Sequence, residues 1–259
     1  MQSRSLAVMM LAATLGCTSA KPAYLGTWVP DQSRTDISNI TWTYEVVDSI
    51  TYRVGVDNQS FLMKMDGSEG ESPWGGTIAA RVLDSTSWES IFRVNGRVMS
   101  TDTMWLSADG NSLTSRSNAV GADGAITSSE TVMTRVDGGP GLAGTWRGSS
   151  TSGGMLGELS FALAGDSGLD INFGGMNAAC SPTFDGADAA ATSPMFDDGW
   201  TCAISADSAR SLLIAWKRQG ENRYTASYSV SADGDTLTEV SSAVGTDEPM
   251  TVVYLRKAP

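Results

Sequence analysis

The sequence contains no histidine, few basic residues and only three cysteines, and each scarcity excludes a class of function. Histidine is the commonest general base in enzymes, so its absence removes that base and the serine and cysteine triads that depend on it. Haem ligation through histidine is excluded as well. Most zinc sites are excluded for the same reason. Lysine and arginine number 17 against 29 acidic residues, which gives a net charge of −12. An acidic chain without a basic block does not fit nucleic acid or anionic lipid as a partner.

Long apolar runs are also scarce. The run at residues 6–15 follows Arg4 and precedes small residues, which predicts a secretory signal peptide over residues 1–20 rather than a membrane span. Leu15-Gly16-Cys17 resembles the end of a bacterial lipobox, in which Cys17 is lipidated, although Thr14 stands where that pattern prefers leucine. Ordinary cleavage after Ala20 is the alternative. In either case we expect an exported protein, in the cell envelope, the periplasm or outside the cell, that touches membrane only through a lipid anchor.

The other two cysteines, Cys180 and Cys202, both lie in the second half of the chain. In an oxidising compartment two cysteines in one domain pair more often than not, so we expect a disulfide between them. A metal-binding pair is the minor alternative, since no histidine is present to complete a site. We expect no metal and no cofactor.

What the sequence does contain is an internal repeat. Gly-Thr-Trp occurs at residues 26–28 and again at 144–146, and Ser-Ala-Asp-Gly occurs at 107–110 and 231–234. Each copy closes on a short apolar segment with an arginine, Arg135 or Arg256. Repetition of this kind predicts two copies of one module. Residues 137–141, Asp-Gly-Gly-Pro-Gly, predict a linker between a first module at 21–136 and a second at 142–259.

The period of the apolar residues is two, which is typical of strands with one buried face. Residues 40–45, 52–57 and 88–95 all alternate in this way. Asn95-Gly96 is a strong hairpin signal, and Asp-Gly pairs at 109–110, 123–124 and 233–234 predict further turns. We predict an all-β protein in which each module is an antiparallel up-and-down barrel of about eight strands, with a two-sheet sandwich as the alternative. Residues 176–191, rich in alanine and glycine, are expected to form a long loop pinned by Cys180.

Gly-x-Trp on a first strand with an arginine on the last strand resembles the structural signature of the lipocalins and related calycin barrels. The resemblance implies that a guanidinium stacks on each indole and closes one end of its barrel. Carried over by position, the expected pairs are Trp28 with Arg135 and Trp146 with Arg256. These residues are structural in the family, so the resemblance predicts a fold and no activity. It also implies that a ligand enters at the opposite end of the barrel.

The favoured function is non-enzymatic binding of a small apolar or amphiphilic molecule in a barrel cavity, since barrel mouths are common ligand sites. The expected cavity wall is an aromatic and methionine face of the first module, with filling of a solid core as the alternative. Its members are Trp42, Tyr44, Phe61, Met63, Met65, Trp88 and Phe92.

A second hypothesis is a surface module that binds carbohydrate or protein, with solid barrels and sugar stacking on Trp74 or Trp200. An enzyme is not expected, because no catalytic constellation is visible. Carboxylates at Glu130, Asp197 and Asp198 fit surface solvation better than paired acid and base catalysis. Asp185 and Asp188 with Asp197 and Asp198 do not have the spacing of a regular calcium loop. The oligomeric state is left open.

Overall fold

The computed structural model describes residues 21–258 apart from 57–58, 122–123, 155 and 247–248. The predicted signal peptide and Cys17 therefore lie outside the described residues. The two elements that are not strands are single 3-10 turns, η1 (Gln32–Arg34) and η2 (Gly174–Met176). The described part of the chain holds no helix that is both long and apolar enough for a membrane span.

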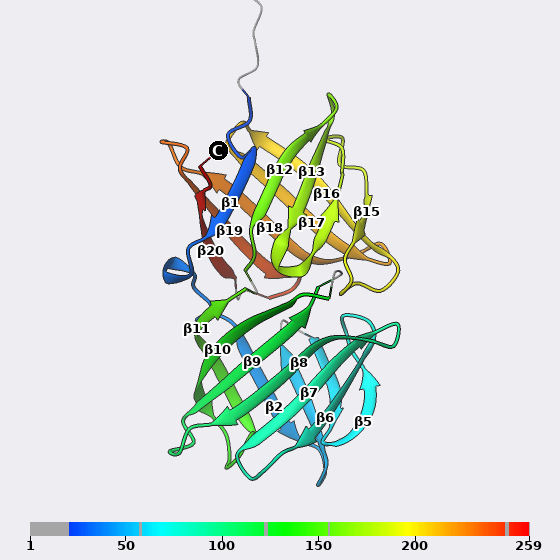
Figure 1. The fold of residues 1–259 in the computed structure, drawn as a ribbon, viewed down its shortest axis with the longest axis vertical. Helices are drawn as coiled ribbons and strands as arrows, with labels where there is room; N and C mark the ends of the chain where they lie inside the picture. Colours follow the sequence, from blue (N-terminus) through cyan, green and yellow to red (C-terminus); the bar gives the residue numbers. More distant parts are fainter. Residues whose placement is uncertain (1–20, 57–58, 122–123, 155, 247–248, 259) are drawn as a thin grey trace, which may run out of the picture.

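The strands form two antiparallel sheets stacked one above the other (Figure 1). The upper sheet, which we call the closed barrel, is hydrogen-bonded all the way round. Its strands are β1 (Gly26–Pro30), β12 (Leu159–Ala164), β13 (Gly168–Phe173), β14 (Ala178–Cys180), β15 (Ala189–Thr192), β16 (Trp200–Ser208), β17 (Ser211–Arg218), β18 (Glu221–Val230), β19 (Thr236–Ala243) and β20 (Met250–Arg256).

The lower sheet also has ten strands but is closed less completely, because its end strands β4 and β5 do not pair with each other. We call it the seamed barrel and the gap between β4 and β5 the seam. Its strands are β2 (Thr41–Val46), β3 (Thr51–Val56), β4 (Gln59–Lys64), β5 (Asp66–Glu71), β6 (Thr77–Val82), β7 (Ser87–Val94), β8 (Arg97–Leu106), β9 (Ser112–Val120), β10 (Ile126–Asp137) and β11 (Gly144–Gly153).

The predicted all-β fold with two antiparallel barrels is thus confirmed, with ten strands in each sheet instead of about eight. The predicted hairpin lies between β7 and β8, where Asn95 and Gly96 have φ angles of 50° and 77°. Two successive positive φ values give a turn whose twist matches that of the flanking strands, which is why Asn-Gly predicts hairpins well. Residues 176–191 are less irregular than expected, since they include β14 and β15.

The first strand of each half lies in the sheet of the other half. β1 pairs with β12 and β20, and β11 pairs with β10 and β2. In Figure 1 the blue β1 accordingly lies in the upper barrel beside the red β20. The predicted modules 21–136 and 142–259 therefore do not correspond to the two sheets. Both strands begin with Gly-Thr-Trp, so the repeat identifies the type of strand without showing which sheet it completes.

The chain crosses between the sheets after β1 and again after β11, so the barrels meet end to end (Figure 1). Beside the first crossing, Asp36 and Thr251 form an isolated β-bridge between the two parts. Asn39 donates a hydrogen bond to the carbonyl of Pro249 at 3.2 Å. The ends of the barrels at which β1 and β11 finish consequently face each other.

Each barrel has its own apolar core. The core of the closed barrel is larger and includes the predicted disulfide, which joins Cys180 on β14 to Cys202 on β16. The core of the seamed barrel is built on Trp146, Leu113 and Leu142, all with no exposed surface. Trp28, likewise fully buried, belongs to the core of the closed barrel.

Candidate functional site

The four residues expected to close the barrels do form two stacked pairs, but the partners are exchanged. The Arg256 guanidinium lies 4.1 Å from the centre of the Trp28 ring, and that of Arg135 lies 4.1 Å from the centre of Trp146. The predicted pairs Trp28 with Arg135 and Trp146 with Arg256 are therefore wrong. The reason is the strand exchange, which places β1 next to β20 and β11 next to β10.

The guanidinium N–H groups of these two arginines donate hydrogen bonds to backbone carbonyls. Arg256 donates to the carbonyls of Gly234, Leu25 and Ala23 at 2.6–2.9 Å. The Trp28 Nε1 donates to the carbonyl of Tyr24 at 2.8 Å. Arg135 makes the corresponding contacts in the seamed barrel. Each indole is fully buried, with a guanidinium over its ring and its N–H bonded to a backbone carbonyl, so the pairs leave no exposed indole for a ligand.

Most of the expected cavity wall packs into the core of the seamed barrel. Tyr44, Met63, Met65 and Trp88 are buried there. Trp42 and Phe61 pack against the same cluster at its margin. Phe92 is half-buried, on the inward-facing side of β7 opposite Ser100. Of the predicted wall residues, Phe61 is the one that also lines the hollow described next.

The hollow lies along the seam and has a volume of about 480 Å³. It is partly open to solvent, with β4 on one side and β5 and the turn after it on the other. A Cβ placed on Gly70 would lie 3.1 Å from the carbonyl oxygen of Leu62, so the two strands nearly touch at that point. Paired strands lie about 4.8 Å apart, so a third strand does not fit between them there. The lining residues are Ser60, Phe61, Leu62, Lys64, Glu69, Gly70, Glu71, Ser72 and Pro73.

The lining combines apolar side chains with charges of both signs. The Glu69 carboxylate already has two partners: it forms an ion pair with Arg93 at 3.2 Å and accepts a hydrogen bond from the Thr77 hydroxyl at 3.0 Å. Among the described residues, Lys64 and Glu71 make no hydrogen bond or ion pair through their side chains. The hollow thus has a mixed polar and apolar lining, with one lysine and one glutamate that make no hydrogen bond or close ion pair among the described residues, although the Lys64 charge lowers the pKa of Asp48 and of Asp66.

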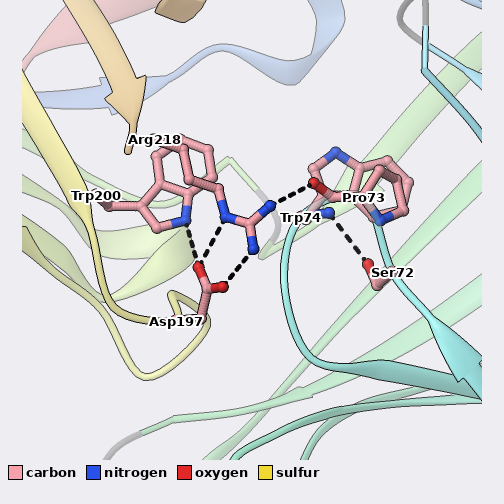
Figure 2. Close-up of polar contacts among 6 residues, drawn as sticks. All are labelled: Ser72, Pro73, Trp74, Asp197, Trp200 and Arg218. Atoms are coloured by element: carbon pink, nitrogen blue, oxygen red, sulfur yellow. Dashed lines mark hydrogen bonds and ion pairs between the residues drawn. The ribbon is translucent and has the colours of Figure 1, made fainter. Parts of the chain in front are cut away.

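One wall of the hollow, Ser72 and Pro73, begins the turn that joins β5 to β6, and this turn reaches the closed barrel (Figure 2). The Arg218 guanidinium pairs with the carboxylate of Asp197 and donates from Nη1 to the Pro73 carbonyl at 3.2 Å. The Trp74 indole donates to the Tyr224 hydroxyl at 2.9 Å. We call this set of contacts the junction.

Trp74 and Trp200, the candidates for sugar stacking, both belong to the junction. Trp200 is 6% exposed, stacks on Phe196 with ring centres 4.7 Å apart, and donates to Asp197 at 3.1 Å. Trp74 is half-buried and meets Phe61 edge-on at 5.7 Å. Trp200 therefore presents no free face for sugar stacking, whereas Trp74 keeps part of its surface exposed.

Three of the other carboxylates singled out in the sequence, Glu130, Asp188 and Asp185, have separate local partners. Glu130 pairs with Arg116 at 2.8 Å, and Asp188 pairs with Lys217 at 2.6 Å. Asp185 accepts the backbone N–H of Ala187 at 3.0 Å. Across the described residues, no three acidic or cysteine side chains come together in a group that could hold a metal ion.

Two buried carboxyl groups escaped the sequence analysis. Asp102 accepts from the Ser100 hydroxyl at 3.1 Å, and burial raises its pKa. Glu239 in the closed barrel accepts from the Tyr254 hydroxyl at 2.9 Å, and burial raises its pKa as well. Each lies on the same face of its strand as buried residues two positions away, Ser100 and Met104 for Asp102 and Leu237 for Glu239. This alternation was the signal available in the sequence.

No protein-family model and no curated protein matches this chain.

Proposed function

We propose that the seamed barrel binds a small amphiphilic molecule in the hollow along its seam, and that the protein acts as an exported, non-enzymatic binding protein of the cell envelope. The observation that carries this proposal is the position of the hollow. It lies where the barrel is not hydrogen-bonded shut, so a ligand reaches it from the side although the two barrel mouths face each other.

The size and chemistry of the hollow support an amphiphile. Its volume of about 480 Å³ lies within the range of about 300–1,000 Å³ that is usual for small-molecule sites. Phe61, Leu62 and Pro73 provide apolar contact area for a chain or ring. Lys64 and Glu71, whose side chains make no hydrogen bond or close ion pair among the described residues, provide charges for a polar head group, although the Lys64 charge also acts on Asp48 and Asp66. The carbohydrate-binding alternative is less well supported, because the Trp200 indole is buried against Phe196 and the Trp74 N–H is already bonded to Tyr224.

The envelope location belongs to the proposal. The disulfide between Cys180 and Cys202 is compatible with an exported protein. Lipidation at Cys17 would tether the chain close to lipids and their breakdown products, which are amphiphiles. Membership of the lipocalin-like barrels is likewise proposed, on the basis of the two stacked tryptophan and arginine pairs.

The experiment is a titration of the protein with doxyl-labelled stearic acid, followed by quenching of tryptophan fluorescence. Leu62 on β4 lines the hollow and is 51% exposed. Leu163 on β12 is 50% exposed on the closed barrel and serves as the matched control. We expect Leu62→Glu to weaken binding about tenfold, since a leucine contact contributes about 1.5–3 kcal/mol. We expect Leu163→Glu to bind as the wild type does. Absence of saturable quenching in the wild type, or equal binding by both variants, would overturn the proposal.

A further inference from the structure

We infer that the closed barrel sets the ligand affinity of the seam hollow, through a clamp in which Arg218 and Asp197 hold the turn after β5. This inference rests on the proposed function of the hollow. It assigns Arg218, Asp197 and Tyr224 as positioning residues for a site that lies on the other barrel.

The turn that is held also forms part of the hollow. Ser72 and Pro73 line the hollow, and Trp74 packs edge-on against Phe61, a further lining residue. The turn has three hydrogen bonds of its own at 3.1–3.2 Å, from the Ser72 N–H to the Gly76 carbonyl, from the Gly75 N–H to the Ser72 carbonyl and from the Trp74 N–H to the Ser72 hydroxyl. These bonds fix the shape of the turn, whereas its position against the hollow also depends on what the turn contacts outside itself.

Figure 2 shows the contacts that reach this turn from the closed barrel. Arg218 uses Nε and Nη2 for the two carboxylate oxygens of Asp197 and Nη1 for the Pro73 carbonyl. A planar guanidinium can make these contacts together, whereas a lysine ammonium cannot reproduce their geometry. The carboxylate of Asp197 is fixed in turn by the indole N–H of Trp200.

Two further contacts join this turn to the closed barrel. A Cβ on Gly75 would lie 2.4 Å from the Asp197 carboxyl carbon, so the backbone of the turn rests directly on this carboxylate. The hydrogen bond from Trp74 to Tyr224 attaches the indole that packs on Phe61. Arg218 and Asp197 are both largely shielded, with side chains 19% and 22% exposed, so water and salt screen their ion pair weakly.

The coupling has to act in both directions. If the clamp favours the position of the turn that binds ligand, then ligand must favour the clamped state by the same factor. Ligand in the seamed barrel is thus expected to stabilise residues 193–199 of the closed barrel, the loop that carries Asp197.

The test uses doxyl-labelled stearic acid with the full chain. We expect Arg218→Gln and Asp197→Asn each to weaken binding about five- to tenfold, and Tyr224→Phe to weaken it less. Lys217→Gln is the control, because Lys217 precedes Arg218 on β17 and its ion pair with Asp188 lies within the closed barrel. Hydrogen exchange of residues 193–199 is measured with and without the probe, and we expect the probe to slow it in the wild type and in Lys217→Gln but not in Arg218→Gln.

The failure of the clamp differs from the failure of the hollow as a ligand site. If the wild type binds the probe, and Arg218→Gln and Asp197→Asn bind it as Lys217→Gln does, the clamp is overturned and the proposed function stands. If the wild type does not bind the probe, the proposed function fails. The clamp is then tested without ligand, because Arg218→Gln should speed hydrogen exchange of residues 72–76. Unchanged exchange there would overturn it.

Discussion

The guanidinium of Arg256 stacks on the indole of Trp28 at 4.1 Å, which joins the last strand of the chain to the first. Between these strands in the sequence lies the whole of the seamed barrel, β2–β11. The closed barrel is therefore built from two separated parts of the chain, and the seamed barrel from one continuous part. This arrangement brings the two barrels end to end, and the seam is the route that we propose for the ligand.

Loss of the Trp28 indole should affect the closed barrel and spare the seamed one. We expect Trp28→Ala to cost about 3–5 kcal/mol, as is usual when a buried tryptophan is truncated. Hydrogen exchange should become faster in β12 and β20, which flank β1. Trp146→Ala is the matched variant and should act on β10 and β2 instead. Faster exchange in β10 on removal of Trp28 would contradict the strand exchange.

The disulfide should stabilise the closed barrel alone. Cys180 and Cys202 are separated by 22 residues in sequence and lie on β14 and β16. Closing a loop of this size contributes roughly 3 kcal/mol through the entropy of the unfolded chain. In the double variant Cys180→Ala with Cys202→Ala, we expect the closed barrel to unfold at a lower urea concentration than in the wild type. Hydrogen exchange of β16 measures this unfolding. An equal loss of protection in β9 of the seamed barrel would contradict this expectation.

Glu239 should make the closed barrel less stable as the pH rises. Burial raises its pKa in the folded state, so the folded protein binds this proton more tightly than the unfolded chain does. The corresponding stability is fully present below the unfolded pKa and is lost as the pH rises through the folded pKa. Glu239→Gln keeps an oxygen for the Tyr254 hydroxyl and removes the titration.

The measurement for Glu239 is urea denaturation of the wild type and Glu239→Gln at several pH values from 4 to 8. The free energy of unfolding of the variant, relative to the wild type, should increase with pH. Exposed aspartates such as Asp48 and Asp233 have lowered pKa values and give the opposite trend, but they are common to both proteins and cancel in the comparison. A difference that does not change with pH would show that Glu239 is ionised in the folded protein.

The turn that bounds the hollow should not tolerate a side chain at Gly76. This residue has a φ of +70°, and a Cβ would lie 2.0 Å from the carbonyl oxygen of Arg93. Gly110 has a similar φ of +73° with nothing within 4 Å of its Cβ position. Gly110→Ala should therefore cost about 1–2 kcal/mol, from backbone strain alone, and Gly76→Ala should cost more in thermal unfolding. Equal losses of stability would show that the turn moves away easily.

The sequence allowed the strands, the hairpin at Asn95-Gly96, the disulfide and the four closing residues to be predicted, because each depends on local pattern or on residue type. The partners of Trp28 and Trp146 were not predictable in the same way. Two strands that begin with the same three residues fit either sheet, and only the path of the chain after each strand decides between them.

The hollow proposed as the site shares only Phe61 with the cavity wall expected from the sequence. The apolar face with methionines and aromatics exists in the seamed barrel, but most of its side chains fill the core of that barrel. The hollow instead lies at the seam. The seam forms because β4 and β5, the end strands of this sheet, do not pair with each other. The junction of Arg218, Asp197 and Pro73 depends on contacts between distant parts of the chain, which alternation and turn signals do not report.

The measurement that tests the central claim most directly is photo-crosslinking with a diazirine-bearing fatty acid, followed by mass spectrometry of the labelled peptides. The account predicts that the label is found on residues 60–73, on the two sides of the seam, and that unlabelled fatty acid competes for it. Label confined to the closed barrel, or label that unlabelled fatty acid does not displace, would contradict a ligand site at the seam.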